Sequence, residues 1–87
     1  MGFLSSLFGT NKLNADPDQQ ALSQLFIDVA ERRKHANDIL GFLMNKQWSR
    51  SEKGNRIIHA ISMVKVFRAD LYPRVKEIGE TMYKIVS

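Results

Sequence analysis

Apolar residues recur in the second half of the chain at alternating intervals of four and three positions. This spacing predicts one long helix from Ser49 to Val86, because it keeps the apolar side chains on a single helical face. Arg68 occupies the step between Val64 and Leu71 and places a charge in the middle of that face. The apolar positions are Ile57, Ile61, Val64, Leu71, Val75, Ile78, Met82 and Ile85. We expect the rest of the chain to pack against this helix.

An earlier apolar stripe predicts a second helix, from Asp16 to about Gln47. Asp16, Pro17 and Gln19 form a favourable start, because they suit the cap, the first helical position and the capping box. Gly41 lies inside this helix and off the stripe, at a cost of up to ~1 kcal/mol relative to alanine, and suggests a close approach. The predicted buried positions are Leu22, Leu25, Phe26, Val29, Ala36, Leu40, Leu43 and Met44.

The segment from Trp48 to Gly54 predicts the turn between the two helices. Ser49 and Glu52 have the spacing of a capping box, so the long helix should start here. Trp48 is expected to close this end of the bundle.

Pro73 interrupts the long helix, because it cannot donate a hydrogen bond to Ala69 and crowds that turn. Two outcomes remain open. In the first, the helix is continuous and kinks at Pro73, because a straight helix through the proline would cost about 3 kcal/mol. Alternatively the helix breaks, and Asp70 caps a short third helix.

These elements predict an all-α fold, an antiparallel two-helix hairpin over residues 16–87 whose second helix is kinked or broken at Pro73. The chain has 87 residues and no cysteine, so its core is small and no disulfide or thiolate metal site can reinforce it. Two helices cannot cover each other's apolar faces. We therefore expect assembly into a helical bundle, by self-association into a homo-oligomer or by docking on another protein.

A short amphipathic helix is predicted at the start of the chain, over residues 1–9, followed by a polar linker at 10–15. Its apolar face consists of Phe3, Leu4, Leu7 and Phe8. Such a helix is marginal alone in water. It can form on a membrane or in a partner's groove, or it can fold over the protein's own bundle. The sequence leaves these alternatives open.

Arg33 and Arg68 face each other when the two predicted helices are paired as an antiparallel hairpin. Two guanidinium groups in one apolar layer need a shared anion, and neither helix is expected to supply one. The pair could bind a partner's carboxylate or a small anion, or both side chains could extend past their aliphatic stems to solvent. Ile27 and Phe42 point away from the predicted interface and suggest a second apolar contact.

Catalytic and metal-binding patterns are weak in this sequence. Asp28, Glu31, His35 and Asp38 share the outer face of the first predicted helix, but their spacing is not a specific metal motif, and a solvated face explains them. No nucleophile with a nearby base and no glycine-rich phosphate loop is recognisable. We therefore expect no enzyme activity, no metal and no cofactor.

The charge balance favours anionic partners without selecting one. The chain carries 13 Lys and Arg against 9 Asp and Glu, a formal net charge of +4. No signal peptide or span of bilayer length is recognised, which predicts a cytoplasmic protein. The interpretation is a non-catalytic protein–protein interaction module, a small adaptor or regulator, peripheral to an anionic membrane through its N-terminal arm. The alternative is a basic nucleic-acid-binding regulator.

Overall fold

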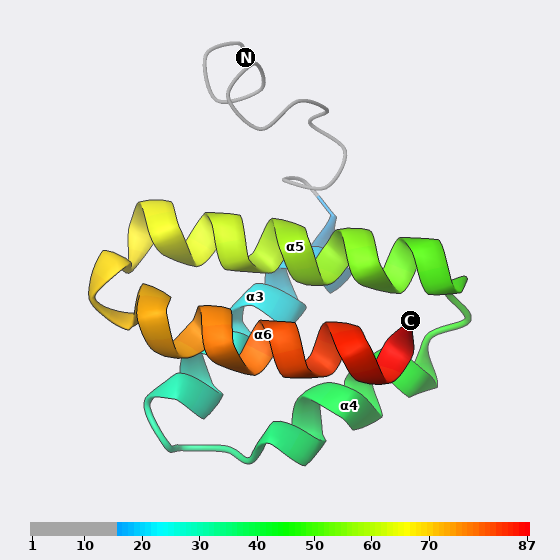
Figure 1. Cartoon of the computed structure of the whole chain (residues 1–87), viewed down its shortest axis with the longest axis horizontal. Helices are drawn as coiled ribbons and strands as arrows, with labels where there is room; N and C mark the ends of the chain where they lie inside the picture. Colours follow the sequence, from blue (N-terminus) through cyan, green and yellow to red (C-terminus); the bar gives the residue numbers. More distant parts are fainter. Residues whose placement is uncertain (1–15) are drawn as a thin grey trace, which may run out of the picture.

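The computed structural model describes residues 16–87, which form four α-helices and one short 3₁₀ turn without any strand (Figure 1). In chain order these are α3 (Pro17–Ala30), α4 (Ala36–Asn45), α5 (Arg50–Phe67), η1 (Ala69–Leu71) and α6 (Tyr72–Val86). The all-α prediction is confirmed, but the two-helix hairpin is wrong because each predicted helix is divided into two. The arm at residues 1–9 and the linker lie outside the described residues.

Both predicted helix starts are confirmed by their caps. The Asp18 N–H donates to Asp16 Oδ1 at 2.8 Å, and Pro17 occupies the first turn of α3. The Glu52 N–H donates to Ser49 Oγ at 3.1 Å at the start of α5. Short polar side chains thus satisfy N–H groups that have no partner within the helix, as local sequence predicted.

The first predicted helix ends early, in a Schellman motif around Arg32. The Arg33 N–H donates to the Asp28 carbonyl at 2.8 Å, and the Arg32 N–H donates to the Val29 carbonyl at 3.0 Å. Arg32 has a φ of 65°, a left-handed conformation that usually selects glycine. The prediction of a continuous helix to Gln47 is therefore wrong. No glycine or proline marks this break, so the apolar pattern alone could not indicate it.

The second predicted helix is broken rather than kinked. α5 ends at Phe67, η1 follows Arg68, and α6 begins at Tyr72. Pro73 lies in the first turn of α6, where its missing N–H needs no partner within the helix. The break therefore precedes the proline. The new helix follows Leu71 rather than an Asp70 cap, and it has 15 residues.

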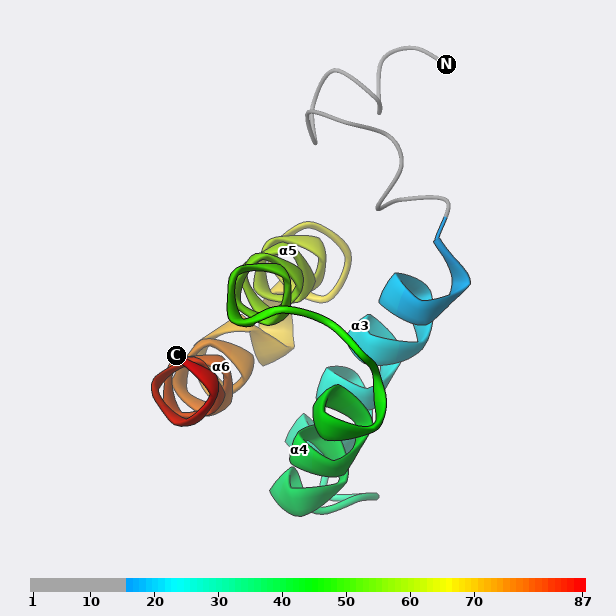
Figure 2. The same cartoon turned by 90° about the vertical axis from the view of Figure 1, so that its right-hand side faces the viewer.

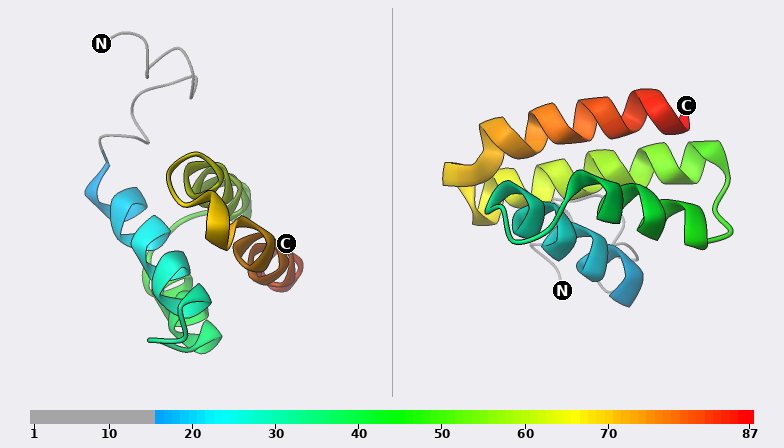
Figure 3. Two further views of the ribbon diagram at one scale, coloured as in Figure 1. Left: turned by 90° about the vertical axis from the view of Figure 1, so that its left-hand side faces the viewer. Right: turned by 90° about the horizontal axis from the view of Figure 1, so that it is seen from below.

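The four helices form two layers, α5 with α6 and α3 with α4 (Figure 2). α3 and α5 run in one sense and α4 and α6 in the other (Figure 3). Contacts confirm this direction, since Gln19 meets Arg56 and Glu31 meets Arg68, with the same spacing along α3 and α5. The predicted antiparallel pairing of the first and second helical segments is therefore wrong, because α4 makes the return.

One apolar core joins all four helices. The breaks change which side of each helix faces the core. In α4, Ile39 is buried, whereas Ala36 and Met44, which were expected to be buried, are exposed. In α6, Val86 is buried instead of Ile85. Burial in α6 follows Val75, Gly79, Met82 and Val86, a helical period that starts afresh after the break. The buried apolar residues are Leu22, Leu25, Phe26, Val29, Ala30, Ile39, Leu43, Ile57, Ala60, Val64, Val75, Met82 and Val86.

The close approach of helices occurs at Gly79 and not at Gly41. A Cβ added to Gly79 would overlap the Ile61 side chain, with Cγ1 only 2.8 Å away. Nothing lies within 4 Å of a Cβ added to Gly41. Gly79 therefore lets α6 pack directly on α5, whereas the close approach suggested for Gly41 is wrong.

Replacing Arg32 with glycine should raise the free energy of unfolding by about 0.5–1 kcal/mol, because glycine adopts positive φ without steric cost. In a continuous helix the same change would lower it by about 1 kcal/mol. Urea melts of Arg32→Gly therefore distinguish a chain that breaks at Arg32 from one with a continuous helix there. Lys34→Gly, in the same loop without positive φ, is the control and should not be stabilising.

Alanine at Gly41 and alanine at Gly79 should have opposite effects on stability. Gly41→Ala should raise the free energy of unfolding by up to about 1 kcal/mol through helix propensity alone. Gly79→Ala should lower it by about 1 kcal/mol, because overpacking against Ile61 outweighs the same gain. Thermal melts measure both changes, and equal effects would contradict the described packing of α5 and α6.

Candidate functional site

Two surface hollows flank α3. The first, called the α3–α5 groove, has a volume of about 170 Å³. The second, called the α3–α4 hollow, is larger, with a volume of about 800 Å³. The groove is lined by Gln19, Gln20, Ser23, Gln24, Ile27, His59, Met63, Val64 and Phe67.

The lining of the α3–α5 groove is apolar toward the C-terminal ends of α3 and α5, and polar but uncharged toward their N-terminal ends. Ile27 of α3 and Met63 of α5 line it, the buried Val64 forms part of its lining, and Phe67 lies at the α5 end with 57% of its surface exposed. Three of the four lining residues of α5, His59, Met63 and Phe67, recur at intervals of four positions, so they form a ridge along one helical face. No lysine, arginine, aspartate or glutamate lines the groove within the described chain.

His59 contributes a titratable group to this groove. Burial lowers its pKa below the ordinary value of 6.5, and the nearby Arg56 charge lowers it further. The imidazole is therefore neutral at pH 7. As a result, the lining residues of the groove carry no formal charge under physiological conditions.

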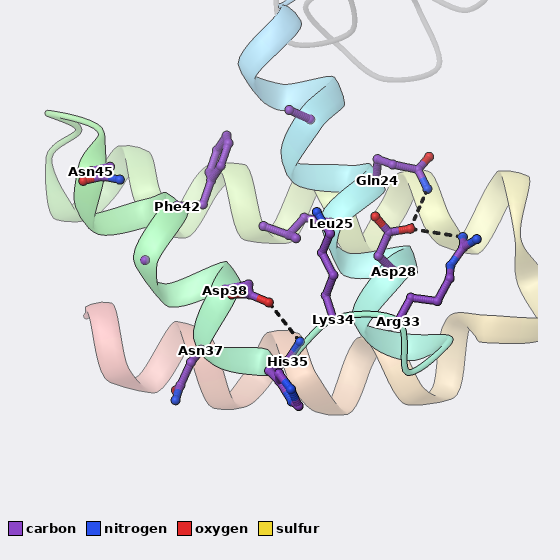
Figure 4. Close-up of a pocket in the computed structure, with 12 residues that line it drawn as sticks. Gln24, Leu25, Asp28, Arg33, Lys34, His35, Asn37, Asp38, Phe42 and Asn45 are labelled. Carbon is purple, nitrogen blue, oxygen red and sulfur yellow. Dashed lines mark hydrogen bonds and ion pairs between the residues drawn. The ribbon is translucent and has the colours of Figure 1, made fainter.

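The α3–α4 hollow has a charged rim on which Asp28, Arg33 and Asp38 are already paired (Figure 4). Asp28 Oδ1 accepts from Arg33 at 3.1 Å and from Gln24 at 3.0 Å. The His35 backbone N–H donates to Asp38 Oδ2 at 3.0 Å, which caps α4. These contacts stabilise the break between α3 and α4, so the paired charges of the rim have a structural role.

Arg33 and Arg68 share an anion that the sequence analysis did not expect. Glu31 Oε1 lies 2.6 Å from Arg33 Nη2, and Glu31 Oε2 lies 2.9 Å from Arg68 Nη2. Asp70 also pairs with Arg68, at 3.1 Å. The break after Ala30 brings Glu31 toward Arg68, so the expectation that neither helical segment supplies an anion is wrong.

These contacts shift the ionisation of the Arg68 cluster. Hydrogen bonds from Arg68 lower the pKa of Asp70, and hydrogen bonds to Asp70 and Glu31 raise the pKa of Arg68. Arg33 is largely exposed, and both arginines lie outside the helices. Binding of a partner's anion by this pair stays a prediction.

The two residues of the predicted second apolar contact lie in different hollows. Ile27 lines the α3–α5 groove, whereas Phe42 lines the α3–α4 hollow. Phe42 already packs on Trp48, with ring centroids 6.2 Å apart, and Lys46 Nζ lies 5.0 Å from its ring. Ile27 is therefore the member of the pair that belongs to the uncharged groove. Phe3, Leu4, Leu7 and Phe8 lie outside the described residues.

A buried arginine cluster beside the groove was missed by the sequence analysis. Arg56 Nη2 lies 2.9 Å from Asp16 Oδ2 and 2.9 Å from Glu52 Oε2. The guanidinium carbon is 4.2 Å from the Trp48 ring centroid, and Gln19 Nε2 donates to the Arg56 carbonyl at 3.0 Å. The i,i+4 spacing of Glu52 and Arg56 was the only available signal. This cluster fixes one end of the groove by joining the starts of α3 and α5.

The Arg56 cluster shifts the pKa of both partners. The Arg56 hydrogen bond holds the pKa of Asp16 below its ordinary value of 3.8. Burial acts to lower the pKa of Arg56, but hydrogen bonds to Asp16 and Glu52 outweigh it and raise that pKa. The ion pair is therefore present throughout the physiological pH range.

Neither a metal site nor a membrane span is found in the described part of the chain. Within residues 16–87, no three His, Cys, Asp or Glu side chains gather closely enough to hold a metal ion. None of the helices there combines the length and apolar character that crossing a bilayer requires. Comparisons of the chain with protein-family models, curated proteins and solved structures find no match.

Asp16→Asn should lower the free energy of unfolding at pH 7 by about 1–3 kcal/mol, because the buried Arg56 loses one carboxylate while asparagine still caps α3. The native pKa of Asp16 is lowered, so its contribution is present above the ordinary value and is lost as pH falls through the native pKa. The difference between wild type and variant should therefore shrink in acid. Urea melts between pH 7 and pH 2 measure it, with Asp18→Asn, which removes a more exposed ion pair, as the control.

Proposed function

We propose that this chain is a non-catalytic helical interaction module whose α3–α5 groove binds the apolar face of a helix from a partner protein. One observation carries the proposal. The groove combines an apolar part, formed by Ile27, Met63, Val64 and the exposed Phe67, with polar but uncharged residues along the rest of its lining. Grooves of this kind recognise amphipathic helices by burying apolar anchors at i, i+3, i+4 and i+7.

The dimensions of the groove fit a short helical ligand. Gln20 and Ile27 both line it, and seven helical steps span about 10 Å. A ligand of about two helical turns covers this length. Phe67 is the principal contact in this proposal, because a large aromatic side chain that becomes buried contributes strongly to binding.

Other parts of the sequence-based hypothesis remain proposals beside this one. Self-association and attachment to an anionic membrane through Phe3, Leu4, Leu7 and Phe8 depend on surfaces or residues beyond the groove. The nucleic-acid alternative has less support, because Arg33 and Arg68 already pair with Glu31. The groove therefore supports protein binding better than it supports binding of phosphate.

Phe67→Ser should weaken partner binding at least about tenfold, whereas Ile58→Ser should leave it unchanged. Both residues lie on α5 with similar exposure, 57% and 51%, but only Phe67 lines the groove. Proteins captured from the source cells by wild type and by Ile58→Ser, but not by Phe67→Ser, are purified and titrated against all three chains. Equal affinity of a captured protein for the three chains would contradict the proposal.

A further inference from the structure

We propose that the N-terminal arm of this chain, defined as residues 2–9, occupies the α3–α5 groove in the free protein and must leave it when a partner helix binds. This inference rests on the proposed function, because it names the first ligand of the same groove and the way access to it is regulated.

The arm matches the groove in chemistry. Its sequence, GFLSSLFG, has no charged side chain, and its apolar face in a helix consists of Phe3, Leu4, Leu7 and Phe8. The described groove lining has no Lys, Arg, Asp or Glu, and the lowered pKa keeps His59 neutral. An uncharged apolar helix can therefore enter without burying an unpaired charge, which would be costly.

The chain is long enough to place the arm along the whole groove. The described chain begins at Asp16, close to Gln19 and Gln20, which line the groove. The linker at residues 10–15 spans up to about 20 Å when extended. This length allows the chain to reverse direction beside α3. The arm, about 12 Å long as a helix, then extends from the Gln20 end toward Ile27 and Phe67.

The covalent linker favours binding of the arm in the groove over an arm that stays in solvent. A helix of two turns is marginal alone in water, so the arm gains from an apolar surface on which to fold. A short linker holds it near the groove at an effective concentration in the millimolar range. A weak intrinsic affinity is therefore sufficient for occupancy, and a partner helix must compete with the arm.

The test uses a spin label on the full chain, which has no cysteine to interfere. Ser6→Cys places the label opposite the apolar face of the arm. The amide signals of Ser23, Ile27, Met63 and Phe67 should broaden strongly, and those of Asn37 and Glu77 on the α4 and α6 side should not. Adding Phe3→Ser and Leu7→Ser to the labelled chain should restore the groove signals.

A mixed sample identifies the occupant. Isotope-labelled wild type is combined with spin-labelled chain that carries no isotope, so that only contacts between copies broaden the signals. We expect no broadening in this sample. Broadening of the groove signals there would show that a second copy occupies the groove, and it would overturn the inference. Absence of groove-selective broadening in the directly labelled chain would also overturn it.

Competition supplies an independent measurement. A synthetic peptide of residues 1–12 should bind the Phe3→Ser, Leu7→Ser chain at least about tenfold more tightly than wild type, because the arm no longer competes. Equal affinities would overturn the inference. If these experiments fail but Phe67→Ser still loses the captured partner, only the arm inference falls. If they succeed and Phe67→Ser loses no partner, the proposed function falls and the intramolecular contact stands.

Discussion

The division of both long helical stretches near their middles is the constraint on which this structure depends. Two uninterrupted helices would leave much of their apolar faces in water, because a hairpin covers only one side of each. Breaking each stretch gives four shorter helices around one core. The breaks also meet in space, since Glu31 at the first pairs with Arg68 at the second at 2.9 Å. That pair is partly exposed and contributes modestly to stability, so the apolar burial determines the arrangement and the ion pair refines it.

α3 packs on α4, α5 and α6, so it contacts every other described α-helix. Its apolar face enters the core, while its two flanks border the α3–α5 groove and the α3–α4 hollow. The buried Arg56 cluster fixes the start of α3 to the start of α5. A network of charged hydrogen bonds therefore bounds the groove at one end and holds α3 in a fixed position relative to α5. A preformed surface of this kind loses little entropy when it binds a ligand.

Charge is distributed so that the groove stays uncharged although the whole chain has a formal charge of +4. The arginines expected at the centre of the fold lie instead at the breaks, where Glu31, Asp28 and Asp70 neutralise them. Ion pairing therefore serves the turns, and apolar contact remains for the groove. This separation favours a helical ligand over a phosphate backbone, because recognition of phosphate needs unpaired basic groups on the binding surface.

Local signals in the sequence determined the helical class and the helix starts at Asp16 and Ser49, because a cap depends on residues only two or three positions away. Periodicity also identified most of the core, including Leu22, Phe26, Ile57 and Val75. The break at Arg32 was decided by tertiary structure, since no local preference favours arginine at positive φ and only packing of α4 on its neighbours can offset that cost. The direction of α3 relative to α5, and with it the groove, followed from that break. Ile27, Met63 and Phe67 could not be grouped from the sequence, because the register that brings them together exists only after the chain has reversed twice.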